Sequence, residues 1–259
     1  LLMKFKLMLK FKLNIILFFC LFNSYGNSNF NSDSLFNQAN LFYEDRNYTE
    51  ANKGYLELKD KGYYSKELFL NLGNSYFKLD SIPHAILSFE KGLKIAPGDK
   101  NLIHNLKICN SIIKDKFVVK ESIHITDWIY VFLGKSTNYW AISSIILMLA
   151  CFSFLTLFLF TESKTLKKAT FYTSIATFII SLFTVYFAWL SNDKLQDTNY
   201  CILFTPHVWI KAEPSINAEN NYKLHEGSKM KIIDENTKWL EISFDEKIGW
   251  IEKKDVKRI

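Results

Sequence analysis

Apolar residues between positions 66 and 99 recur at the spacing of two short helices. In the first part of this segment, the apolar positions lie three or four residues apart, which places them on one face of a helix. Gly73 has no side chain, so a second helix can approach that face closely. Pro83 suits the first turn of the second helix, and Pro97 and Gly98 end it. The pattern therefore predicts a helix–turn–helix unit.

This unit fits the 34-residue pattern of the tetratricopeptide repeat (TPR), which presents a binding surface and carries no chemistry of its own. The matching positions hold Phe69, Leu72, Gly73, Tyr76, Ile82, Ala85, Phe89 and Pro97. A weaker copy over residues 32–65 holds Ala39, Phe42, Tyr48, Ala51 and Tyr55. Residues 100–114 supply half a unit, which we expect to be a capping helix. We predict a TPR domain at residues 32–116, because both copies share one spacing. The alternative is a plain bundle of helical hairpins.

Two later stretches, residues 139–160 and 169–190, contain no charged residue. Each is long enough to span a bilayer, for which about 20 apolar residues suffice. We therefore predict two transmembrane helices. The residues between them, 161–168, hold Lys164, Lys167 and Lys168 against Glu162. The positive-inside rule predicts that this basic loop is cytoplasmic.

Residues 1–26 are typical of a secretory signal peptide, with lysines before a short apolar run and small residues that allow cleavage after Gly26. An uncleaved anchor and a lipidated Cys20 are the alternatives. A secreted N-terminus and a cytoplasmic loop together predict that residues 32–116 and 199–259 both lie outside the cytoplasm. Residues 117–138 are expected to be a linker or an interfacial helix, amphipathic over residues 125–134.

After residue 198 the apolar pattern changes to the alternation of strands. Five short runs predict a small all-β domain at residues 199–259, namely residues 200–204, 208–212, 229–234, 239–244 and 248–252. The domain resembles the bacterial SH3 family in a few short segments, which are Trp209-Ile210-Lys211, Glu226-Gly227, Trp239 and Gly249-Trp250-Ile251. Such a barrel could bind peptide or cell-wall glycopeptide. Its candidate surface is Trp209, Trp239 and Trp250, although their places within strands favour a role in the core.

The order of these parts is similar to that of the Bat (aerotolerance operon) family, and specifically its BatE-like members. The fold class is then an α-helical TPR solenoid with two transmembrane helices and a small SH3-like barrel. The resemblance implies a place in a membrane complex with von Willebrand A-type Bat proteins and a MoxR-type AAA+ ATPase, linked to stress or oxygen tolerance. It also implies a bacterial inner membrane, with both folded domains on the periplasmic side.

In a TPR stack the first helix of each pair lines the concave face. The residues predicted to line this groove are Phe36, Asn40, Tyr43, Leu70, Asn71, Asn74, Phe77, Asn101 and His104. Asn40 and Asn71 match the two amides of the clamp with which some TPR domains hold a terminal carboxylate. The basic positions of that clamp hold Phe36, Asn101 and Asn105, so we predict no clamp. An uncharged groove suits an extended or helical protein segment.

Composition excludes several other functions. The chain has 259 residues, of which 49% are apolar. Its net charge is +6, and lysines are concentrated near its start. The sequence shows no basic groove with interleaved aromatic residues that would bind nucleic acid. None of its five histidines has the spacing of a zinc site, and no nucleophile or phosphate-binding motif occurs. A Cys109–Cys201 disulfide is possible but not required. We predict a scaffold without enzymatic activity, cofactor or metal. A peptidoglycan-binding membrane protein is the alternative.

Overall fold

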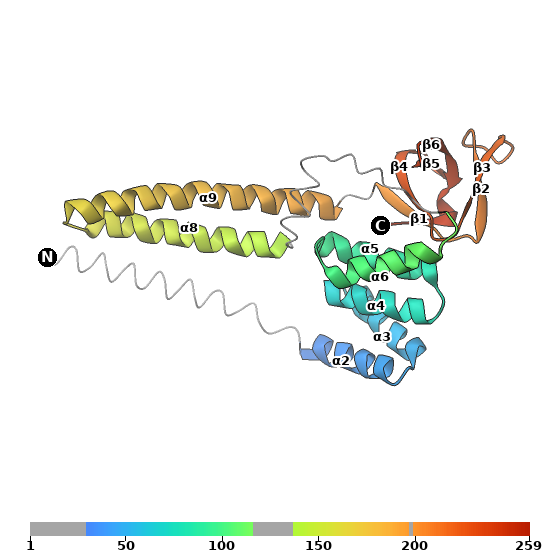
Figure 1. The fold of residues 1–259 in the computed structure, drawn as a ribbon, viewed down its shortest axis with the longest axis horizontal. Helices are drawn as coiled ribbons and strands as arrows, with labels where there is room; N and C mark the ends of the chain where they lie inside the picture. The colour runs from blue at the N-terminus through green and yellow to red at the C-terminus, as the bar shows by residue number, and fades with distance from the viewer. Residues whose placement is uncertain (1–29, 116–136, 197–198) are drawn as a thin grey trace. The chain divides into compact units, whose positions relative to one another are not determined.

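The computed structural model describes residues 30–115, 137–196 and 199–259. The predicted signal peptide and the predicted interfacial helix at residues 125–134 lie outside these ranges. In the described parts the chain forms seven α-helices, followed by seven strands with one short 3-10 helix (Figure 1). Of the described residues, those up to Tyr63 belong to one compact unit, and those from Tyr64 to Ile259 belong to a second.

The first unit contains α2 (Phe30–Glu44) and α3 (Tyr48–Asp60), which pack against each other. The turn between them places Arg46 in the left-handed region with a φ of 61°. The two helices approach closely at Ala39 and Gly54, since a Cβ atom on Gly54 would lie 2.9 Å from that of Ala39. Tyr55 is fully buried in this contact.

The second unit begins with α4 (Lys66–Lys78), α5 (Ile82–Ile95) and α6 (Lys100–Ile112). The close approach expected at Gly73 is confirmed, because a Cβ atom there would lie 2.6 Å from Cδ1 of Phe89 on α5. Ser65 caps α4 and Asp99 caps α6 through side-chain oxygens that accept backbone N–H bonds. These two caps stand 34 positions apart in the sequence.

Two long apolar helices follow, α8 (Thr137–Phe160) and α9 (Lys164–Gln196), which lie side by side in Figure 1. Both are long and apolar enough to cross a membrane. Their contact includes the small buried side chains of Cys151, Ser174 and Ser181, and near its ends the ring pairs Trp140–Phe187 and Phe158–Phe171. The predicted loop at residues 161–168 is shorter than expected, since α9 already begins at Lys164. The first turns of α9 carry Lys164, Lys167 and Lys168.

The C-terminal β-domain, residues 199–259, is a seven-stranded antiparallel sheet in the order β3-β2-β6-β5-β4-β1-β7. Its strands are β1 (Tyr200–Leu203), β2 (His207–Lys211), β3 (Asn220–His225), β4 (Lys229–Glu235), β5 (Trp239–Phe244), β6 (Lys247–Glu252) and β7 (Val256–Arg258). Residues from all seven strands share one buried apolar core. The five predicted strands are present with small shifts at their ends, and β3 and β7 were missed.

Candidate functional site

The nine predicted groove residues divide between the two units. Three lie on α2 in the first unit, four on α4 and two on α6 in the second. On α2, the side-chain oxygen of Asn40 accepts a hydrogen bond of 2.7 Å from the Tyr55 hydroxyl. The ring of Phe36 lies 6.0 Å from that of Tyr55, and the ring of Tyr43 lies 5.2 Å from that of Tyr48. Burial raises the pKa of Tyr43. All three α2 side chains thus rest partly on α3.

Asn74 on α4 has a similar role in the second unit. Its Oδ1 accepts a hydrogen bond of 2.7 Å from Nδ2 of Asn105 on α6. Asn74 stands 34 positions after Asn40, and both amides use their oxygen to accept a bond from a later helix. Asn105 occupies one of the basic positions of a carboxylate clamp, and here it ties α6 to α4 instead. Within each unit, a predicted groove residue is therefore an amide held in place by a bond from a later helix.

The remaining predicted residues differ in their exposure. Leu70 and Phe77 are half-buried and pack against the apolar cluster of α5 and α6, and Asn71 is also half-buried. Asn101 and His104 on α6 are exposed. Ile108 and Ile112, which were not predicted, follow His104 at intervals of four residues and are 39% and 56% exposed. The free face of α6 is therefore more apolar than the groove prediction alone indicates.

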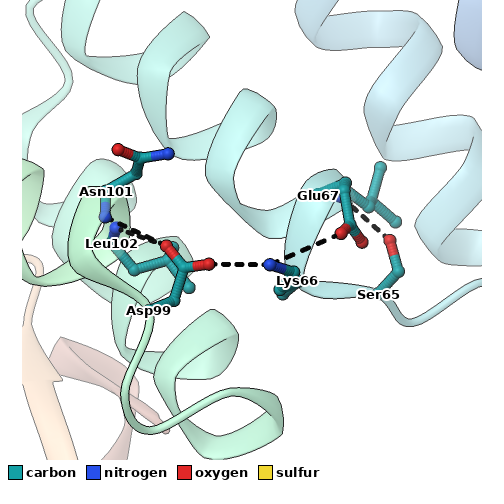
Figure 2. Close-up of polar contacts among 7 residues, drawn as sticks. Ser65, Lys66, Glu67, Asp99, Asn101 and Leu102 are labelled. Carbon is teal, nitrogen blue, oxygen red and sulfur yellow. Dashed lines mark hydrogen bonds and ion pairs between the residues drawn. The ribbon is translucent and has the colours of Figure 1, made fainter.

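The N-terminus of α6 carries an ion pair with α4. Oδ1 of Asp99 accepts backbone hydrogen bonds from Asn101 and Leu102, and Oδ2 lies 2.8 Å from Nζ of Lys66 on α4 (Figure 2). The hydrogen bond from Lys66, helped by the two backbone N–H groups, lowers the pKa of Asp99. Figure 2 shows the carboxamide of Asn101 pointing away from this contact. The charge of Lys66 is matched within the fold by Asp99.

The three tryptophans of the β-domain lie on one face of the sheet. Lys211 and Glu241 both pair with Trp250 across the strands, and Trp239 pairs with Glu252. Because side chains alternate between the two faces of a strand, Trp209, Trp239 and Trp250 all point away from the core that contains Ile210, Leu240 and Ile251.

The expectation that these indoles fill the core is therefore wrong for Trp209, which is 48% exposed. Trp250 is half-buried, and Trp239 is 8% exposed although it lies on the outer face. The strand pattern could not show this, because β2 carries apolar residues on both of its faces. Trp209 and Trp250 remain a candidate surface for a ligand.

Two cysteines in the described ranges, outside the apolar helices, are buried thiols. Cys109 on α6 and Cys201 on β1 are both unpaired and fully buried. Burial raises the pKa of Cys109 to about 11 and that of Cys201 to about 12. The optional Cys109–Cys201 disulfide is absent. In the parts of the chain that the structure describes, no three His, Cys, Asp or Glu side chains are grouped as metal ligands would be.

Comparison of the sequence with protein-family models and with curated proteins finds no match.

Proposed function

We propose that this protein is a membrane-anchored scaffold that docks other proteins outside the cytoplasm. The observation that carries the proposal is the surface of α8 and α9. Only 6% of the apolar window of α8 and 17% of that of α9 is buried against the rest of the described chain. An apolar helix at the core of a water-soluble protein would be mostly buried, because exposed apolar surface is costly in water. A bilayer supplies the apolar surroundings that these helices lack.

The helical region supports the docking part of the proposal. Helix pairs with caps 34 positions apart, a close approach at Gly73 and equivalent amides at Asn40 and Asn74 agree with TPR repeats. A TPR surface of amides and rings, continued by Ile108 and Ile112, suits a segment of a neighbouring protein. The β-domain then serves as an SH3-like module.

The order of the helical region, the two apolar helices and the β-domain adds a more specific proposal, which is membership of the Bat family. A BatE-like protein would have von Willebrand A-type Bat proteins and a MoxR-type ATPase complex as partners. The basic residues at the start of α9 and the signal-like N-terminus favour an orientation with both folded domains on the periplasmic side.

Site-specific photocrosslinking in native membranes tests the scaffold proposal. A photoreactive residue at His104 should capture a membrane or periplasmic protein, and N74A should weaken that capture. The same residue at Asn110, which is exposed but lies about a third of a turn around α6, is the matched control. Capture that is equal at both positions, or that ignores N74A, would refute docking on this face.

The exposure of Trp209 favours a second candidate, in which the β-domain binds peptidoglycan and the helical region is secondary. Exposed indoles are suited to stacking against sugar rings or apolar side chains. Sedimentation of the full chain in nanodiscs with purified peptidoglycan tests this candidate. Saturable binding that W209A abolishes would support it, and the absence of binding would leave the scaffold as the function.

A further inference from the structure

The β-domain is packed against α5 and α6 through a continuous apolar cluster. Ile86 and Phe89 of α5 and Cys109 of α6 are buried in this cluster together with Ile202 of β1 and Ile259. All five side chains are at most 7% exposed. A contact that buries side chains to this degree has the character of a protein core and is strongly favoured by the hydrophobic effect.

The turn between β3 and β4 is shaped to fit the helices. Gly227 has a φ of +84°, which favours glycine. Its backbone comes so near that a Cβ atom would lie 2.6 Å from Cγ2 of Ile113 and 3.3 Å from Cδ1 of Ile86. Any side chain at this position would therefore push the β-domain away from α5 and the end of α6.

Polar contacts fix the orientation of the two parts. Oε1 of Glu90 on α5 lies 2.7 Å from Nζ of Lys229 on β4, and their side chains are only 12% and 24% exposed. Nζ of Lys94 donates a bond of 2.8 Å to the carbonyl oxygen of Ile259. His84 is stacked against Tyr76 and lies 4.6 Å, between ring centroids, from Phe204 after β1. These contacts specify one arrangement rather than a loose apolar collapse.

Both ends of the segment that carries α8 and α9 are tied to this same body. Oδ2 of Asp115, where the described helical region ends, accepts bonds of 2.6 Å from the backbone N–H of His225 and 3.3 Å from Oγ of Ser228. At the other end, the carbonyl of Asn199 accepts a bond of 2.7 Å from the N–H of Ile232. The chain therefore leaves the body and returns to it.

We infer that α4–α6 and the β-domain form one docked body, into which the two long apolar helices are inserted as a loop. A docked body lies wholly on one side of a membrane, so the inserted segment must cross an even number of times. This conclusion uses neither the lysines at the start of α9 nor the N-terminal residues. The statement on sidedness rests on the proposed membrane anchor, whereas docking itself does not.

Reversal of the Glu90–Lys229 pair in the full chain in nanodiscs tests the docking. N-ethylmaleimide is the probe, and peptide mass spectrometry identifies which thiol has reacted. Breaking a largely buried ion pair is strongly destabilising, so E90K and K229E should each raise the labelling rate of Cys109 about tenfold or more. The double variant E90K/K229E should restore slow labelling. K61E, at the exposed Lys61–Glu57 pair, is the matched control and should change nothing.

Fast labelling of Cys109 in the unmodified chain, or the absence of rescue in the double variant, would overturn the docking. Unfolding of a single variant would also raise the labelling rate of Cys109. It would not explain a return to slow labelling in E90K/K229E, so the double variant distinguishes loss of the ion pair from unfolding.

A membrane-impermeant maleimide tests the sidedness. Asn110→Cys on α6 and Ile216→Cys in the segment between β2 and β3 are both exposed positions, and Ile216 is 74% exposed. In sealed vesicles of one orientation both should react, and in the opposite orientation neither should. Reaction of the two positions from opposite sides would overturn the inference. Complete extraction of the protein by alkaline carbonate would refute the proposed membrane anchor and leave the Cys109 result standing.

Discussion

Substitution of Gly73 by alanine would test the closest helix contact of the second unit. The added methyl group would lie 2.6 Å from Cδ1 and 2.8 Å from Cζ of Phe89, whose ring is 1% exposed. Overpacking of this kind costs about 1–3 kcal/mol. Alanine recovers about 1 kcal/mol because it favours a helix more than glycine does. The difference is a loss of about 0–2 kcal/mol, and because the aromatic ring is rigid and surrounded we expect the upper part of this range, about 1–2 kcal/mol.

Hydrogen exchange of the full chain in nanodiscs, followed by mass spectrometry, measures this loss locally. Amides in α4 and α5 should lose protection by about 5–30-fold in G73A, since 1.4 kcal/mol corresponds to a factor of ten. In the F89L background the same glycine substitution should cost little, because the ring that it meets is gone.

Gly92 offers the matched comparison. A Cβ atom there would meet the terminal methyl groups of Leu102, at 2.8 and 2.9 Å, rather than a ring. The end of a leucine side chain can shift more easily, so G92A should cost less than G73A. A G73A protein as stable as the parent chain, or a G92A protein that is the less stable of the two, would refute the packing argument.

Three further predictions concern charge, exposure and thiol chemistry. The lowered pKa of Asp99 implies stabilisation that is present above the ordinary carboxyl value near about 4 and is lost as the pH falls through the lower folded value. The protection factors of the amides at the start of α6 should therefore fall in acid in the parent chain but not in D99N; an equal response of both would contradict the Lys66 contact. W209A should change the free energy of unfolding by less than about 0.5 kcal/mol, whereas W239A should lower it by about 3 kcal/mol or more. Denaturant melts measure both values, and a larger loss in W209A than in W239A would contradict the assigned exposures. Cys201, with a pKa of about 12, should resist dithionitrobenzoate at pH 8 until the protein unfolds, and rapid reaction of the folded protein would contradict its burial.

The elements that sequence predicts best are those with a long or repeated signal. The uncharged stretches become α8 and α9, and the spacing of Gly73 and Phe89 becomes a real helix contact. α9 begins at Lys164, within the predicted loop at residues 161–168 and before the predicted span at 169–190. Lysine is a good helix former, and its flexible side chain can keep the charge in water beyond an apolar segment.

Other features had no local signal. In β3, only Leu224 is buried, and residues such as Asn220 and Asn221 have low strand propensity, so the strand depends on its pairing with β2. The position of Trp209 depends on which face of β2 meets the core, which alternation alone does not decide. The contact between Glu90 and Lys229 joins residues 139 positions apart, and no local pattern of apolar and polar residues predicts it.

That separation in sequence has a consequence for how the protein is made. Lys94 and Ile259, whose contact helps to close the docked body, lie 165 positions apart, with both long apolar helices between them. During synthesis α5 therefore emerges well before the strands that will cover Ile86. Its partner surface cannot be complete until the last strand has been translated. Closing so long a loop is slow, so assembly of the docked body comes last, and a chain halted before β7 would leave an apolar helix face open to aggregation.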